Sequence, residues 1–151
     1  MVQFQDDPTT CFRAFNSDAK GRNNCVATER SGGVSHDLSK KRCIPCEGGI
    51  PTISPQNAGE FLKELQGWEL SSEGRSIRIE YPMKDFASAI RLVDTIAQVA
   101  EAENHHPDIH LTGYRRLVIE LSTHAIGGLS ENDFILAAKI QKLPKDLKIP
   151  K

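Results

Sequence analysis

Asn104-His105-His106-Pro107-Asp108 divides the second half of the chain into a predicted helix and predicted strands. Proline pushes the residue that precedes it out of the α-helical region, so we expect the helical pattern to end near Glu103 or Asn104. Both imidazoles then lie on irregular backbone, where binding and catalytic residues concentrate. This stretch is therefore the first place to look for a functional site.

The residues before this stretch, 85–103, have the pattern of a long amphipathic helix. Its apolar face consists of Phe86, Ile90, Val93, Ala97 and Ala100, and Leu92, Ile96 and Val99 widen the stripe. Glu101 falls near the margin of this face. It is either a functional carboxylate beside the histidines or a solvated side chain at the helix end.

The residues after this stretch predict two strands, 109–111 and 115–123, joined by a turn at Thr112-Gly113. In the second strand Leu117, Ile119 and Leu121 share one face, and Glu120, Ser122 and His124 share the other. His124 therefore lies off the apolar stripe, which argues against a core histidine.

A last helix is expected after Gly127-Gly128, because Ser130-Glu131-Asn132-Asp133 resembles a capping box. Its apolar residues are Phe134, Ile135, Ala138 and Ile140. Asp133 could be no more than that cap.

The first half of the domain begins with Ser54-Pro55, a helix start in which the Ser hydroxyl accepts from a free N–H and Pro loses no hydrogen bond. We expect this helix to run to about Gln66 and to end at Gly67. Two strands follow, 68–70 and 77–81, joined by the turn Ser72-Glu73-Gly74.

The predicted order of elements is αββαββα. Strands joined by short turns pair in antiparallel fashion, and the helices then cover one face of the sheet. We therefore predict a single α+β domain with a four-stranded antiparallel sheet.

Composition excludes several classes of function. The 151 residues include 19 basic and 20 acidic side chains, which give a formal net charge of −1. The chain therefore has no overall positive charge that would attract nucleic acid or an anionic membrane. The apolar runs fall well short of the ~20 residues that span a membrane, and the N-terminus lacks the apolar stretch of a secretory signal. We expect a soluble, cytoplasmic protein that binds neither nucleic acid nor membrane.

Residues 1–42 show neither helical nor strand periodicity and are rich in polar residues, so we expect a flexible N-terminal extension. A targeting peptide is the alternative, although Asp6, Asp7, Asp18 and Glu29 are unusual in a transit sequence. Gly48-Gly49-Ile50-Pro51 marks the expected boundary. The predicted division is an extension over 1–42, a leader over 43–53 and a folded domain over 54–151.

All cysteines, Cys11, Cys25, Cys43 and Cys46, lie in the first third of the chain, which is not the distribution of a disulfide framework. A reducing compartment is the simpler interpretation. Cys43 and Cys46 have the spacing of half a zinc site, but Cys11 and Cys25 do not form the second close pair that a structural site needs. We favour ordinary thiols in a loop.

The histidines are the remaining candidates for chemistry, because the sequence has no Gly-rich phosphate loop, dinucleotide fingerprint or nucleophile beside a base. Metal ligation and proton transfer both use a neutral imidazole near pH 7. His105, His106 and Asp108 could imitate a two-histidine, one-carboxylate iron site, but neighbouring residues of extended chain point in opposite directions. We therefore favour a role of these histidines in proton transfer over metal binding. The other alternative is that they are surface histidines with no chemical role.

Several motifs occur in a specific order: Asn104-His105-His106-Pro107-Asp108, Ser122-Thr123-His124, Gly127-Gly128-Leu129-Ser130 and Asp133. Together they resemble the pterin-4a-carbinolamine dehydratases, over about residues 54–143. Gly67-Trp68 also matches, and residues 43–49 look like the leader of many plant, protist and bacterial-type members. The resemblance implies dehydration of 4a-hydroxytetrahydropterin to quinonoid dihydropterin without metal or cofactor. This reaction regenerates the tetrahydrobiopterin-type pterin that aromatic amino acid hydroxylases use.

The resemblance also implies roles for individual residues. His105, His106 and His124 would be acid and base groups around the pterin. Further substrate contacts would come from Asn104, Pro107, Ser122, Thr123 and Ala125, and support from Glu101, Asp133 and Trp68. The chemistry agrees, because loss of the C4a hydroxyl needs a proton delivered to oxygen and one removed from N5, and imidazoles titrating near ~6.5 can do either. Asn104 stands where animal members carry Asp, and the loop between His106 and His124 is longer than theirs.

Assembly and partners are implied in the same way. The family resemblance implies a homotetramer, a dimer of dimers, and a functional link to an aromatic amino acid hydroxylase. Exposed strand edges and the positions Leu92, Ile96 and Val99, beyond the face that one sheet needs, favour self-association. Animal members also bind a homeodomain transcription factor, so the alternative is an interaction protein that uses the fold as a dimerisation module.

Overall fold

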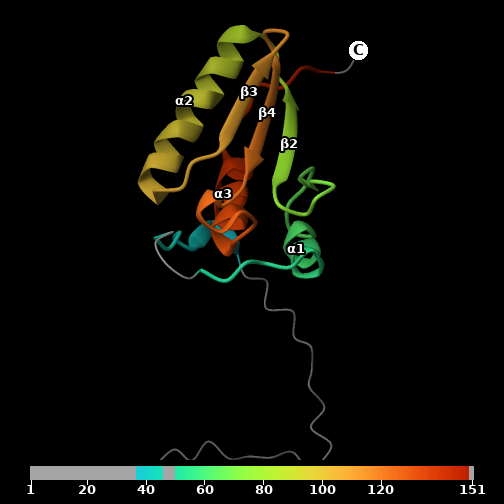
Figure 1. Ribbon diagram of the computed structural model, residues 1–151. Helices are drawn as coiled ribbons and strands as arrows, with labels where there is room; N and C mark the ends of the chain where they lie inside the picture. The colour runs from blue at the N-terminus through green and yellow to red at the C-terminus, as the bar shows by residue number, and fades with distance from the viewer. Residues whose placement is uncertain (1–36, 46–49, 150–151) are drawn as a thin grey trace, which may run out of the picture. The chain divides into compact units, whose positions relative to one another are not determined.

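The computed structural model of the protein describes residues 37–45 and 50–149. Its helices are α1 (Pro55–Leu62), α2 (Phe86–Glu103) and α3 (Glu131–Lys142), and its strands are β1 (Glu69–Leu70), β2 (Ile77–Pro82), β3 (Asp108–Thr112) and β4 (Arg116–Leu121). Two short 3-10 helices are η1 (Leu38–Lys40) and η2 (His124–Ile126). Apart from these short helices, the order is the predicted αββαββα (Figure 1).

The strands form one antiparallel sheet in the order β1-β2-β4-β3. Alternation places apolar side chains on one face, where Ile77, Ile79, Leu117 and Ile119 are buried in the core. The opposite face is charged and exposed, and there Arg116 forms two hydrogen bonds with Glu80. The predicted α+β class is confirmed.

The start of α1 follows the prediction, because the Ser54 hydroxyl accepts from the Asn57 N–H at 3.4 Å and Pro55 is the first helical residue. The helix ends at Leu62 rather than near Gln66. From there to Leu65 the N–H groups bond to carbonyls three residues earlier, a tighter turn than an α-helix. Gly67 then adopts φ +80°, a left-handed conformation that favours glycine.

Helix α2 ends where the sequence predicts, but for a different reason. Asn104 has φ 49° and ψ 39°, a left-handed C-cap, and its N–H still bonds to helix carbonyls. Asn is one of the few residues that adopt this conformation at low cost. The cap lies well before Pro107, so the turn at Asn104 rather than the proline ends the helix.

The buried face of α2 is rotated from the predicted one. Leu92 and Ile96, expected to extend beyond the face covering the sheet, are buried in the core, whereas Phe86 and Ile90 are exposed. The reason is that α2 packs against α3 as well as covering the sheet, which buries more of its circumference. The prediction that Leu92 and Ile96 offer surface for self-association is therefore wrong.

Helix α3 is central to the core, with Phe134, Leu136 and Ile140 fully buried. Helix α1 packs against it through the stacked rings of Phe61 and Phe134, whose centroids are 4.8 Å apart. Such offset ring pairs contribute about 0.5–1.5 kcal/mol beyond the burial of their surface. This contact packs α1 against the first turn of α3.

The folded part begins earlier than predicted. Leu38 in η1 is only 3% exposed and belongs to the core, although residues 37–42 were expected to continue a flexible extension. Lys41 pairs with Glu131 of α3 at 2.5 Å, so this segment packs on the domain through contacts distant in sequence. Residues 1–36 of the extension expected over 1–42, and residues 46–49, which include Cys46, lie outside the described residues.

Among the helices of the described residues, none combines the length and the apolar character that a membrane span requires.

Candidate active site

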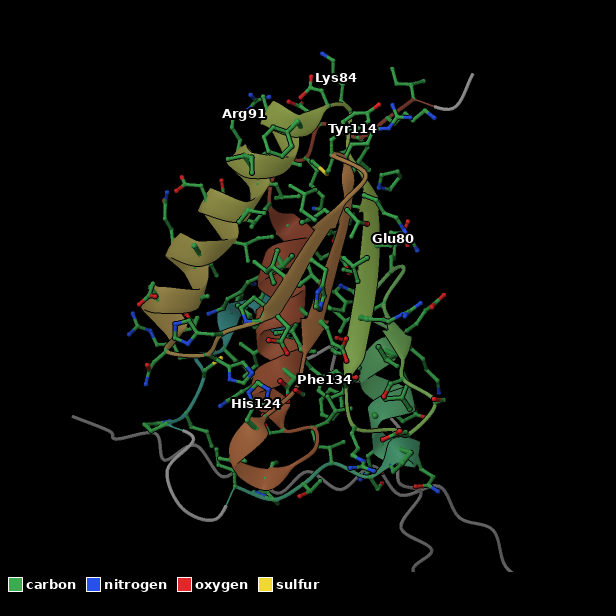
Figure 2. The ribbon with its side chains drawn as sticks, turned by 45° about the horizontal axis from the view of Figure 1, so that its top comes forward. Glu80, Lys84, Arg91, Tyr114, His124 and Phe134 are labelled. Atoms are coloured by element: carbon green, nitrogen blue, oxygen red, sulfur yellow. The ribbon has the colours of Figure 1, made fainter. Side chains whose placement is uncertain are left out.

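A cavity of about 190 Å³ opens where α2 ends and β4 leads into η2. Its wall is made by Asn104, His105, His106, Ser122, Thr123, His124 and Ala125. The structure thus brings together all of the predicted substrate-binding residues except Pro107, which does not line the cavity. Figure 2 shows His124 at the end of the sheet opposite Tyr114 and Lys84.

His105 is the buried imidazole of the cavity, and its Nε2 lies 2.7 Å from Asp133 Oδ1. A carboxylate only accepts, so Nε2–H donates this bond and the neutral ring carries its proton on Nε2. Asp133 Oδ2 accepts from the Thr123 hydroxyl and from the Ser130 N–H, both at 2.8 Å. Asp133 therefore caps α3, as predicted, and also fixes the His105 ring.

His106 turns the other way and is exposed. Its Nε2 lies 3.3 Å from Glu101 Oε1, one helical turn back along α2. The adjacent histidines thus have separate carboxylate partners on opposite sides of the chain, as expected from extended backbone.

His124 is the most exposed of the three, because the alternation of β4 carries it off the apolar face and η2 begins there. Its Nε2 lies 3.8 Å from Asp108 Oδ2. This distance is too long for a hydrogen bond but close enough for an electrostatic interaction with a protonated ring. Each imidazole therefore faces a different carboxylate.

Within residues 37–45 and 50–149, no group of three or more His, Cys, Asp or Glu side chains is arranged to hold a metal ion. The separate pairing of the three imidazoles explains this, since each ring is directed at its own carboxylate rather than at a shared centre.

Two predicted residues lie elsewhere or act differently. Trp68 is buried in the core and lines neither the histidine cavity nor a neighbouring one. Thr123 lines the cavity, but its side chain is buried and its hydroxyl is committed to Asp133 and Ser130. The same strand alternation that places His124 outside places Thr123 inside. Asp108 as the partner of His124 and Ser130 as part of the buried network were missed by sequence reasoning.

The segment 37–45 supports the site from behind. The Cys43 N–H donates to Glu103 at 2.9 Å, and the backbone of Ile44 exchanges two hydrogen bonds with the Asn132 side chain. These contacts join the last residue of α2 to the first turn of α3, next to His105 and Asp133.

The electrostatics of this support are distinctive. Burial, followed by the nearby Glu103 carboxylate, raises the pKa of the Cys43 thiol to about 12. Burial would also raise the pKa of Glu103, but the hydrogen bonds from Lys139 and Cys43 and the charge of Lys139 outweigh it, so that pKa is lowered. Glu103 and Lys139, 2.5 Å apart and largely buried, therefore form an ion pair.

Comparisons with known proteins agree on one family. A family model described as Pterin 4 alpha carbinolamine dehydratase matches residues 51–143. The chain is 42% identical over 110 residues to Pterin-4-alpha-carbinolamine dehydratase 2, mitochondrial, from Arabidopsis thaliana, covering 71% of this chain and 59% of that relative. A relative from Nitrosospira multiformis with the same family name is 44% identical over 107 residues, covering 71% of this chain and 92% of the relative.

Among solved structures, the chain is similar to that of a transcriptional coactivator/pterin dehydratase from Brucella melitensis. The TM-score is 0.56 and the sequence identity 29%, and the match covers 60% of this chain and 95% of that one.

Proposed function

The chain belongs to the pterin-4a-carbinolamine dehydratase family, and we propose that it dehydrates a 4a-hydroxytetrahydropterin to the quinonoid dihydropterin by proton transfer through His105, His106 and His124. The observation that carries this proposal is that the three imidazoles, each with its own carboxylate, line one cavity. No metal or cofactor takes part in the proposed reaction.

The reaction breaks the C4a–O bond and forms the C4a=N5 double bond. A protonated imidazole donates its proton to the leaving hydroxyl, which departs as water, and a neutral imidazole removes the proton from N5. One ring therefore gains the proton and another loses it, and exchange with solvent restores both. Three imidazoles around one cavity supply both groups.

The environments of the rings suggest different tasks. The exposed His106 and His124 can exchange protons with water, and the carboxylates of Glu101 and Asp108 lie beside them. His105 is buried and held by Asp133, so beside its part in proton transfer it can orient the pterin and stabilise charge that develops in the transition state. Ser122 and Asn104 line the cavity, and we assign the Ser122 hydroxyl and the Asn104 amide to bind the polar edge of the ring.

The proposed role is recycling of the tetrahydropterin that an aromatic amino acid hydroxylase oxidises, with the cytoplasm as the location. For assembly we propose a homotetramer, a dimer of dimers. Phe86 and Ile90 on α2, which are 53% and 45% exposed, supply apolar surface for it. Light scattering of the full chain at micromolar concentration should give four times the chain mass, and a monomer would contradict the assembly.

A second candidate is a non-enzymatic dimerisation or coactivator-type protein, which the name of the Brucella melitensis protein favours. A scaffold alone does not require the buried pair of His105 and Asp133 beneath an open cavity. Enzymatic activity therefore explains more of the structure.

Stopped-flow measurement of dehydration tests the proposal. A synthetic 4a-hydroxytetrahydropterin mixed with the full chain should lose water faster than in buffer, in proportion to the enzyme concentration. A rate equal to the uncatalysed rate would refute the dehydratase and leave the interaction protein.

A further inference from the structure

The segment 37–45 lies before the residues that the family model matches, yet it packs along the length of α3 (Figure 1). At one end Asp37 pairs with Lys142, the last residue of the helix, at 3.0 Å. Further along, Lys41 pairs with Glu131, the first residue of the helix, at 2.5 Å. The segment is therefore held from one end of α3 to the other.

Two consecutive residues of this segment then bridge α3 to α2. The Cys43 N–H donates to Glu103, the last residue of α2, at 2.9 Å. The Ile44 N–H donates to the Asn132 side chain at 3.0 Å, and the Asn132 NH₂ group donates to the Ile44 carbonyl at 2.7 Å. Neighbouring backbone groups thus connect the end of α2 to the first turn of α3.

The residues that this bridge connects are close in sequence to the buried pair of the site. Glu103 lies two positions before His105. Asn132 is the residue next to Asp133. The bond between His105 Nε2 and Asp133 Oδ1, 2.7 Å long, joins the same two elements. The junction of α2 and α3 therefore has a direct link through the site and a second link through residues 43–44.

Both anchors of the bridge are shielded from water. Asn132 is buried, and Glu103 is largely buried and paired with Lys139 of α3. A buried polar group that loses its partner keeps the full cost of its desolvation. The bridge therefore fixes the end of α2 relative to α3 more firmly than water-exposed bonds would.

Resting on the proposed function, we propose that Asn132 and Glu103 are positioning residues of the dehydratase. Through the backbone of residues 43–44 they keep the His105 ring against Asp133, and thereby in its place in the wall of the cavity. Catalysis is sensitive to such positioning, because a misplacement of about 1 Å can cost ~10²-fold in rate. The bridge acts on turnover although neither of its backbone residues lines the histidine cavity.

Ile44→Pro tests the bridge from the side of the segment, because proline has no N–H to donate to Asn132. The Ile44 side chain is 57% exposed, so its replacement loses little packing. Ile44→Ala, which keeps every bond of the bridge, is the matched control. In the full-length protein, well below its unfolding temperature, kcat should fall about tenfold for Ile44→Pro and stay unchanged for Ile44→Ala.

The Nε2–H proton of His105 gives a second measurement that needs no substrate. A buried imidazole N–H that donates to a carboxylate exchanges slowly with water and gives a proton NMR signal apart from the backbone amides. Selective isotope labelling of histidine identifies it, since His106 and His124 are exposed. The signal should shift or exchange faster in Ile44→Pro. A protein that had only lost part of its folded population would keep the signal in place at lower intensity.

Asn132→Ala removes the other partner of the Ile44 bonds, and it takes the same two measurements if Ile44→Pro does not fold. Both variants act on one bridge, so combining them should lower kcat no further than Asn132→Ala does alone. Losses that multiply in the double variant would show that the two residues act independently, which would contradict the bridge.

An unchanged kcat or an unmoved His105 signal in folded Ile44→Pro protein would refute the positioning role and leave the dehydratase in place. If the unmodified chain dehydrates no 4a-hydroxytetrahydropterin, the proposed function fails. The His105 signal then still decides whether the bridge holds the ring.

Discussion

Asp133 Oδ1 lies 2.7 Å from Nε2 of His105, which is 28 positions earlier in the chain. Both side chains are buried, and the other oxygen of Asp133 accepts from Thr123 and from the Ser130 N–H. One carboxylate therefore joins the helix cap of α3, the end of β4 and the turn after α2. The histidine cavity depends on this junction.

Replacing Asp133 with Asn should affect stability and turnover together. An amide offers one acceptor oxygen where the carboxylate has two, so its NH₂ group faces a donor. We expect the free energy of unfolding to fall by about 1–3 kcal/mol. Displacement of the His105 ring should lower kcat by about 10²-fold. Urea unfolding and steady-state kinetics measure both. The control Asp94→Asn, on the exposed side of α2, should change neither the free energy of unfolding nor kcat. An Asp133→Asn protein with unchanged stability and kcat would show that Asp133 does not hold the His105 ring.

The sequence predicted the elements whose signals are local. Ser54-Pro55 predicted the start of α1, and the alternation around Leu117 predicted the faces of β4, because caps and strand periodicity act over a few residues. The residues of the histidine cavity could also be predicted, because Asn104–His106 and Ser122–His124 each follow the end of a predicted element. The antiparallel pairing of β3 with β4 brings these two ends together.

The rest depended on contacts between distant residues. Nothing local distinguishes Leu38 from the polar extension around it, and its burial depends on α3, about a hundred positions later. The partners of Cys43, Glu103 and Asn132, are likewise 60 and 89 positions away. The rotation of α2 was missed because periodicity gives the apolar width of a helix and not which of its neighbours covers each part.

Cys43 should resist alkylation in the folded protein. The thiolate is the reacting form, and burial raises the pKa of this thiol to about 12, so little thiolate is present at pH 8. Iodoacetamide labelling followed by peptide mass spectrometry should find Cys43 unmodified in the native chain and modified in denaturant. Equal labelling rates in both conditions would show that the segment 37–45 does not stay packed.

Glu103→Gln should destabilise the protein in a pH-dependent way. The lowered pKa of Glu103 means that its carboxylate stabilises the fold above the unfolded value of ~4.3, and that this contribution is lost as the pH falls through the folded value. We expect a loss of about 1–3 kcal/mol at pH 7, because Lys139 is left buried without its partner. The loss should shrink progressively below pH ~4. Denaturant unfolding from pH 7 to below pH ~4 measures this loss of stability, and Glu64→Gln, at an exposed position, is the control. A loss of stability that does not change with pH would contradict the ion pair between Glu103 and Lys139.

A chain starting at Ile50 should be less stable than one starting at Ser35. The shorter chain loses Leu38 from the core, and complete burial of a leucine contributes about 1.5–3 kcal/mol. It also leaves the Asn132 side chain and Glu103 without the backbone of residues 43–44. Thermal unfolding of the two chains measures the difference. Equal midpoints would mean that the segment contributes nothing to the fold.

The central claim is that His105, His106 and His124 transfer the protons of a dehydration, and turnover of the His106→Ala, His124→Ala double variant tests it most directly. Both rings are exposed, so their removal should leave the fold intact. Each single replacement should lower kcat by no more than ~10²–10⁴-fold, because a neighbouring imidazole can partly replace the missing one. The double variant should be far slower than either single variant. His110→Ala, an exposed histidine of β3 outside the cavity, should keep full activity. A double variant that dehydrates a 4a-hydroxytetrahydropterin at the unmodified rate would contradict the account.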